Sequence, residues 1–287
     1  HHCKNPKSVQ NNLPDGASFN LPDNNLRMAF GVGLLSGVYI TLIFIRPYSG
    51  QIALSELILQ LSGSRGTFCL GFSMAELAGF MLRMLPGYCI MMLLGNSMYQ
   101  YFCTASIYVF SRCPDRMKWY RQTLLPLFSS VLLFECVFVG SSVLLSCLQY
   151  RVLFDTAGAF LTAYHLLTYV LWIFAWVLSI NIAAIKAGSS SAFLLAMGIQ
   201  ALCTAGLGFL QLFVRNDADA VTIRRLLAWN PVAHTVVGWH FSYASYPISA
   251  ICSIAFLASF CIFALSVGGI IVQKHNLLTE NTEWGTM

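Results

Sequence analysis

The stretch GAFLTAYHLLTYVLWIFAWVLSINIAAI, residues 158–185, decides the fold class of this chain. It contains no Asp, Glu, Lys or Arg along its whole length. A helix of about 20 apolar residues crosses the roughly 30 Å hydrocarbon core of a membrane. The stretch therefore predicts a membrane-spanning helix.

The whole chain has the same character, with 57% hydrophobic and only 9% charged residues and a mean hydropathy of +0.68. Typical globular chains carry about 25% charged residues. The apolar stretches predict six spans, at residues 28–45, 77–99, 123–146, 158–185, 192–213 and 248–272. We expect an all-α polytopic membrane protein, with a six-span domain over 28–272, a segment 1–27 before it and a tail 273–287 after it.

The distribution of basic residues predicts the orientation, because Lys and Arg near span ends are retained in the cytoplasm. With the N-terminus inside, the inner segments hold Lys4, Lys7, Arg27, Arg112, Arg116, Lys118, Arg121, Lys186 and Lys274. The outer segments hold Arg46, Arg65, Arg151, Arg215, Arg224 and Arg225. Both termini are therefore predicted to be cytoplasmic. The formal net charge of +5 is spread along loops, so an anionic lipid leaflet is a better counter-charge than nucleic acid.

Catalytic motifs are absent from the sequence. No Gly-x-x-x-x-Gly-Lys-[Ser/Thr] occurs, so any ATP and Mg would be bound by another chain. Glu135, His165, His234 and His240 are candidates for an intramembrane hydrolase or metal site. However, the two later histidines are six residues apart, whereas His-Glu-x-x-His places its histidines at i and i+4. We expect no catalytic residue, metal or cofactor on this chain.

Two charged residues fall in or near predicted spans, Arg83 and Glu135. A charge at the bilayer centre costs about 2.5–3.5 kcal/mol on insertion scales, so such a residue usually faces the bundle interior. One interpretation is a polar element of a translocation path. The other is an interhelical lock in which Glu135 pairs with Arg83 or with a hydroxyl group.

The connection between the second and third predicted spans, residues 100–121, combines aromatic with basic side chains. One interpretation is a topology anchor, because aromatic rings and basic groups both suit the membrane interface. The other rests on Pro114, which breaks a helix and with Asp115 starts a turn. A short charged bend would then project into the cytoplasm.

Two short stretches resemble bacterial ABC-2-type transporter permeases. The first is YFCTASIYVFSR, residues 101–112, followed by Lys118, Trp119 and Tyr120, which is similar to the first coupling helix of that family. The second is NPVAHTVVGWH, residues 230–240, in the loop before the last span. The resemblance covers the whole chain in topology and only these stretches in residues.

The resemblance implies a permease subunit of an ATP-driven exporter in a bacterial plasma membrane, with separate ATP-binding subunits and a second permease as partners. It assigns partner coupling to Arg112, Asp115, Arg116, Lys118, Trp119 and Arg121. It assigns an outer-loop helix to Asn230, Pro231, His234, Trp239 and His240. Asn230 and Pro231 independently predict a helix start, as cap and first helical residue, with Trp239 at the membrane interface.

Two alternatives remain open at this stage. A secondary carrier would be favoured by an internal repeat, and the first three predicted spans show no similarity to the last three. An integral membrane enzyme is the other alternative. The transported substrate is not encoded in any motif, because a wall of Leu, Phe and Met suits peptides, lipids and amphipathic drugs alike.

Overall fold

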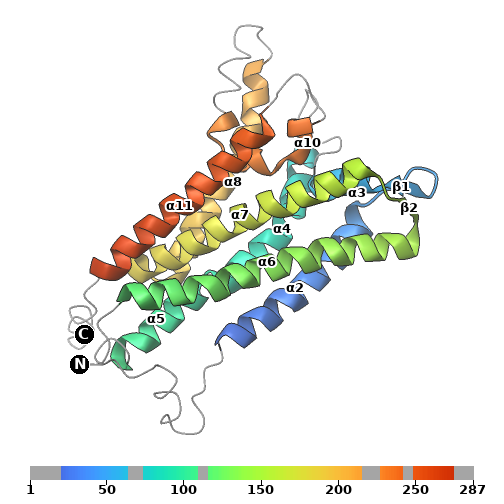
Figure 1. The fold of residues 1–287 in the computed structure, drawn as a ribbon. Coiled ribbons are helices and arrows are strands. Elements are labelled where there is room, and N and C mark those ends of the chain that lie inside the picture. The colour runs from blue at the N-terminus through green and yellow to red at the C-terminus, as the bar shows by residue number, and fades with distance from the viewer. Residues whose placement is uncertain (1–20, 64–73, 109–115, 215–226, 242–247, 275–287) are drawn as a thin grey trace.

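The computed structural model describes residues 21–63, 74–108, 116–214, 227–241 and 248–274. Its elements are α2 (Leu21–Phe44), β1 (Gln51–Ala53), α3 (Leu54–Leu61), α4 (Met74–Leu94), α5 (Ser97–Tyr108), α6 (Arg116–Gln149), β2 (Arg151–Leu153), α7 (Thr156–Ala187), α8 (Ser189–Val214), the 3-10 helix η1 (Ala233–Thr235), α10 (Val237–Phe241) and α11 (Ala250–Lys274) (Figure 1).

Six helical segments among the described residues are long and apolar enough to cross a membrane. They are Asn24–Phe44, Ala78–Phe102, Arg116–Gln149, Thr156–Ala187, Ser189–Leu207 and Ala250–Lys274. The prediction of an all-α polytopic membrane protein is confirmed. One boundary differs clearly: α6 begins at Arg116, about two turns before the predicted start of the third span at residue 123.

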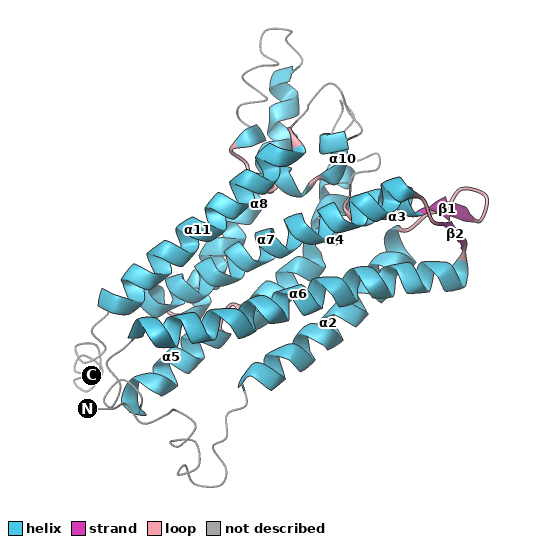
Figure 2. Ribbon diagram, in the orientation of Figure 1, coloured by secondary structure: helices cyan, strands magenta, loops and turns pink. Residues whose placement is uncertain are grey.

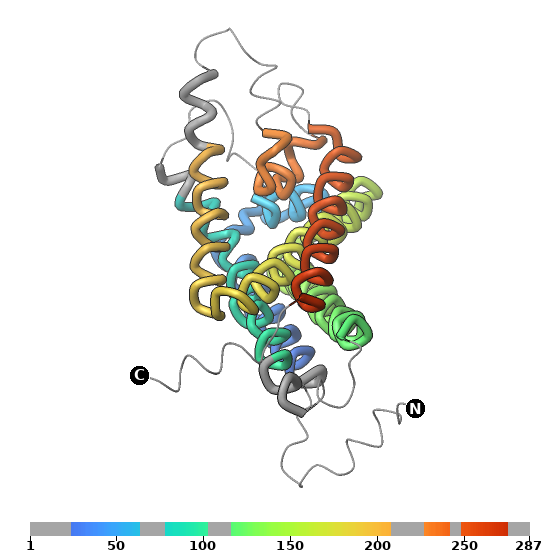
Figure 3. Tube along the Cα trace, turned by 90° about the vertical axis from the view of Figure 1, so that its left-hand side faces the viewer, coloured from blue at the N-terminus to red at the C-terminus, as the bar shows by residue number. Residues whose placement is uncertain are grey.

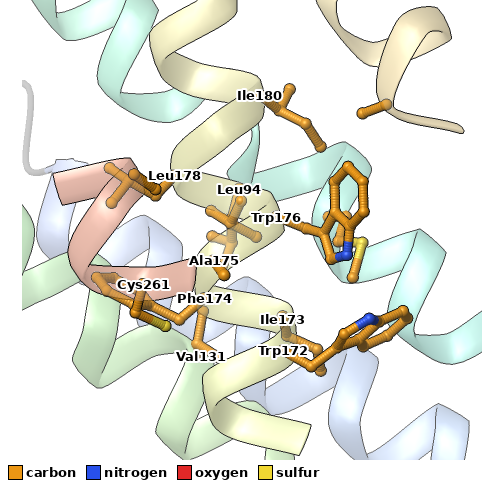
Figure 4. Close-up of a cluster of buried hydrophobic side chains, with 14 of the residues drawn as sticks. Leu94, Val131, Trp172, Ile173, Phe174, Ala175, Trp176, Leu178, Ile180 and Cys261 are labelled. Carbon is orange, nitrogen blue, oxygen red and sulfur yellow. The ribbon is translucent and has the colours of Figure 1, made fainter. Parts of the chain in front are cut away.

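Helix α7 is the central element of the bundle, and α8 and α11 lie on opposite sides of it (Figure 3). Its side chains are buried along most of its length. Trp172 and Trp176, one turn apart, project to the same side of α7, whereas Phe174 lies beside Cys261 of α11 on another side (Figure 4). Gly87 of α4 makes room for this layer, since an added Cβ would lie 3.2 Å from the Trp172 ring.

Helices α2 and α6 pack closely through Gly33 and Gly37, which form a Gly-x-x-x-Gly pair on one face of α2. A Cβ added at either glycine would come within 2.8 Å of an α6 backbone oxygen. Small residues at this spacing let helix backbones approach in the absence of a hydrophobic driving force. The Thr41 hydroxyl group also donates to the Ser142 carbonyl of α6, at 3.4 Å.

A short parallel sheet of β1 and β2 closes one end of the bundle, where Gln51 pairs with Arg151 (Figure 2). It ties the segment after α2 to the segment after α6. The connection between the first two spans, which is unusually long in the sequence, is therefore built partly from β1 and the buried short helix α3. The opposite end carries α5, the start of α6 and the end of α11 (Figure 1).

Candidate functional site

A break in the second span separates α4 from α5, and Asn181 of α7 holds the two helices together. Its side-chain oxygen accepts the backbone N–H groups of Met98 (2.8 Å) and Tyr99 (3.2 Å). Its amide nitrogen donates to the Leu94 carbonyl, at 2.8 Å. One buried side chain thus satisfies the last carbonyl of α4 and the first amides of α5, groups that a helix end leaves unpaired.

Gly95 is required at this break. A Cβ at that position would collide with the Met91 carbonyl and lie 2.8 Å from the Ile180 side chain of α7. The bend predicted at Pro114 lies outside the described residues. The structure places an additional break about five turns earlier, at residues 95–96.

We call α5 and the first two turns of α6, residues 97–108 and 116–122, the elbow. Trp119 lies inside it, stacked on Tyr101 and tilted against Phe102 at centroid distances of 5.6 and 5.4 Å. The Tyr120 hydroxyl group donates to the Leu265 carbonyl of α11, at 3.0 Å. The elbow is therefore held against α7 by Asn181 and against α11 by Tyr120.

The basic side chains of the elbow point differently from its aromatic ones. Lys118 and Arg121 are exposed, while Trp119 is buried. Arg116 makes a long contact of 3.5 Å from Nη1 to the Gln273 carbonyl of α11. The remaining predicted coupling residues, Arg112 and Asp115, lie outside the described residues. Of the predicted set, Lys118 and Arg121 are thus exposed on the surface of the elbow, and Trp119 packs inside it.

A second group of polar residues lies inside the bundle. Glu135 of α6 and His165 of α7 are both fully buried, with Oε1 and Nε2 3.3 Å apart. The distance is that of an ion pair, although the angles do not meet hydrogen-bond geometry. From the sequence, Arg83 or a hydroxyl group is the expected partner of Glu135. The partner found here is a histidine, which sequence spacing could not reveal because the two residues belong to different helices.

Tyr169 extends this group along α7. Its ring lies 4.1 Å from that of His165, and the residue is buried. We call Glu135, His165 and Tyr169 the buried polar cluster. It joins α6 and α7.

A chain of four side chains connects α7, α10, α11 and η1, and we call it the histidine chain. The Tyr164 hydroxyl lies 3.0 Å from His240 Nδ1, and His240 Nε2 lies 2.9 Å from Ser253 Oγ. Ser253 Oγ lies 2.9 Å from His234 Nδ1, and His234 Nε2 lies 2.9 Å from the Ala228 carbonyl.

When both histidine rings are neutral, the Ala228 carbonyl at the end of the histidine chain determines which atom of each side chain carries the hydrogen. A carbonyl only accepts, so His234 Nε2 carries the hydrogen and its Nδ1 accepts from the Ser253 hydroxyl. Ser253 Oγ then accepts from His240 Nε2, and His240 Nδ1 accepts from the Tyr164 hydroxyl. Each donor therefore has one acceptor, and the hydrogen bonds all run in one direction.

Both histidines lie outside the membrane-spanning helices, and burial lowers the pKa of each. For His234 the hydrogen bond to Ala228 opposes the effect of burial, and the pKa remains below 6.5. For His240, burial and the neighbouring His234 lower the pKa to about 4. The neutral forms assumed for the histidine chain therefore prevail at physiological pH.

The four residues considered for a hydrolase or metal site are brought together in pairs. Glu135 meets His165, and His234 meets His240 through Ser253. Spacing along one helix does not reveal these pairs, because the two members of each pair come from separate elements. Within the described part of the chain, no cluster of three or more His, Cys, Asp or Glu side chains could hold a metal ion.

The loop before the last span differs from the predicted helix start. Asn230 Oδ1 accepts the Val232 N–H at 3.0 Å, and its amide donates to the Cys203 carbonyl of α8 at 2.7 Å. The side chain therefore forms a local turn and a link to α8, and the 3-10 helix begins only at Ala233. Pro231 lies in that turn, and Trp239 is buried in the core, contrary to its expected place at the membrane interface.

A scan against protein-family models, a search of curated proteins and a search of solved structures each gave no match to this chain.

Proposed function

We propose that this chain is the permease subunit of an ATP-driven transporter, an exporter of the ABC-2 type in a bacterial plasma membrane. The elbow carries the proposal. It is a helical element at one end of the bundle, with basic side chains exposed and aromatic side chains buried. Such a surface suits docking by charge-assisted hydrogen bonds to acidic groups of a partner.

The attachments of the elbow supply a route from such a partner to the bundle. A displacement of α5 acts on α7 through Asn181, and a displacement of α6 acts on α11 through Tyr120. Helix α7 also carries His165 and Tyr169 of the buried polar cluster. Movement at the elbow would therefore reach the polar interior through one helix.

The proposal implies separate ATP-binding subunits, which bind ATP and Mg, and a second permease that completes the translocation path. In this arrangement both termini and the elbow are cytoplasmic. The end with β1, β2 and α10 faces outside.

Charge reversal tests this function. In proteoliposomes containing the permease and its ATP-binding partner, Lys118→Glu with Arg121→Glu should abolish the permease-dependent part of ATP hydrolysis or the copurification of the partner. Arg151→Glu is the matched control, because it reverses an exposed charge at the opposite end. Retained partner binding and full permease-dependent hydrolysis in the double variant would refute the proposal. A lipid anchor would instead leave the partner bound and lower only the yield.

The buried polar cluster favours a second candidate, a proton-coupled carrier. Intramembrane Glu and His residues in contact are typical of proton relays, and Glu135 with His165 supplies such a pair. A carrier would move protons in vesicles without ATP when an amphipathic substrate is added. An entrapped pH-sensitive dye would report that flux, and Glu135→Gln should abolish it. ATP-dependent transport that Glu135→Gln preserves would exclude the carrier.

A further inference from the structure

A cavity of about 420 Å³ lies at the end of the bundle opposite the elbow, where α2 ends. Its lining comes from the end of α2, the segment after it, α3 and α4, and consists of Phe44, Arg46, Pro47, Tyr48, Gln60 and Arg83. This volume lies within the range of about 300–1,000 Å³ that small-molecule sites occupy.

Both charged residues in the lining are arginines. The guanidinium carbon of Arg83 lies 4.9 Å from the centre of the Phe44 ring, a cation–π contact that orients the group. Although Arg83 belongs to an apolar helix, its long side chain reaches the level at which α2 ends. Arg83, for which the sequence leaves open a translocation-path element or an interhelical lock, lies at the wall of this cavity.

The wall beside Arg46 is held firmly. Gln60 of α3 is buried, its Oε1 accepts the Arg46 N–H at 2.7 Å, and its Nε2 donates to the Arg46 carbonyl at 3.0 Å. The rim is open at Tyr48, which is 79% exposed. A turn with left-handed Ser49 and Gly50, at φ 51° and 74°, follows the rim.

We infer that this cavity binds a phosphate group, carried either by a phospholipid or by a soluble phosphate ester. Guanidinium groups match phosphate oxygens with two parallel N–H donors, which a lysine cannot do. The apolar run of the first candidate span ends at Phe44, which lines the cavity, so in a membrane of ordinary thickness the two arginines would lie near the lipid head groups. Phe44 and Pro47 supply an apolar wall for the group that carries the phosphate. This inference is independent of the proposed mode of transport.

Native mass spectrometry of the full-length chain, released from an uncharged detergent, tests the inference. The parent protein should retain phosphatidylglycerol and release diacylglycerol, which lacks the phosphate. Arg46→Gln with Arg83→Gln should weaken phosphatidylglycerol binding about tenfold or more. Arg151→Gln, which removes an exposed charge near the same end without lining the cavity, should stay within about twofold of the parent.

A soluble glycerol phosphate separates the two sources of phosphate. Displacement of the lipid by millimolar glycerol phosphate would assign the site to soluble esters, and resistance to it would assign the site to the lipid head group. If the double variant does not fold, Arg83→Lys keeps the charge, loses the paired donors and should still weaken binding severalfold. The inference is refuted if the parent binds neither compound, if the cavity variants bind like the parent, or if Arg151→Gln weakens binding equally.

Discussion

Asn181→Leu is the most informative perturbation of the fold, because one side chain joins three helix segments. The substitution keeps a similar volume and removes all the hydrogen bonds of the amide. Two carbonyls lose a hydrogen bond from Asn181 and still keep another donor. Val177 lies within α7, where the helix backbone supplies one, and Leu94 accepts from the Ser97 hydroxyl group at 2.8 Å. The Met98 and Tyr99 N–H groups at the start of α5 lose the acceptor that Asn181 provides.

The expected cost follows from those two amides. A buried donor left without a partner costs about 1–3 kcal/mol, and the loss of a helix N-cap costs about 0.5–2 kcal/mol. Because both amides share one oxygen, we expect Asn181→Leu to lower the free energy of unfolding by about 3 kcal/mol. Ser179→Ala is the matched control on the same helix. Among the described residues its hydroxyl group bonds to the Ala175 carbonyl one turn earlier, a local bond whose loss should cost less than about 0.5 kcal/mol.

Reversible unfolding of the purified protein in mixed micelles, with increasing SDS, measures both variants. Permease-dependent ATP hydrolysis in proteoliposomes should fall in Asn181→Leu as well, because α5 is no longer held against α7. A free energy of unfolding within about 0.5 kcal/mol of the parent would refute the claim that Asn181 joins the elbow to the bundle.

Three further predictions concern the interior. Glu135→Leu and His165→Leu should each lower the free energy of unfolding by about 3–5 kcal/mol. The double variant should lose at least about 1 kcal/mol less than the sum of the two single losses. Additive losses in the same assay would show that the pair does not interact. Between pH 6.5 and about 4 the unfolded chain binds a proton that folded His240 does not, so the free energy of unfolding should decrease as the pH falls, by up to about 1.4 kcal/mol per unit. His240→Asn should flatten that dependence, and an unchanged slope would contradict the histidine chain. Gly268→Ala should cost about 1–3 kcal/mol because its new methyl group meets side chains of α6 and α7, whereas Gly198→Ala, with nothing within 4 Å, should be neutral; equal effects on thermal unfolding would contradict the packing.

The spans were predictable from the sequence because charge-free apolar length is a direct physical requirement of the bilayer. Apolar length does not reveal a helix break inside a span. The break at Gly95 depends on Asn181, a residue from a helix far along the chain, and only the packed structure shows it. Trp119 is likewise a residue type that is common at membrane surfaces, and its burial depends on packing against Tyr101 and Phe102.

The buried polar groups were predictable in part. Glu135 and Arg83 stand out in apolar sequence, and the cost of a buried charge indicates that each needs a favourable environment. Which partners they take was not predictable, because His165 and Phe44 meet them from other helices. Ser253 and Tyr164 gave no signal at all, since single hydroxyl groups are common in apolar helices and satisfy themselves locally.

The most direct measurement of the central claim is photo-crosslinking from the elbow in the native membrane. A photoreactive amino acid at Lys118 should crosslink to a chain that carries Gly-x-x-x-x-Gly-Lys-[Ser/Thr] and hydrolyses ATP, because Lys118 is exposed on the surface proposed to dock that partner. The same group at Arg151, at the opposite end, should give no such product. The account would be contradicted if Lys118 crosslinked to lipid alone. It would also be contradicted if Arg151 crosslinked to an ATP-binding chain.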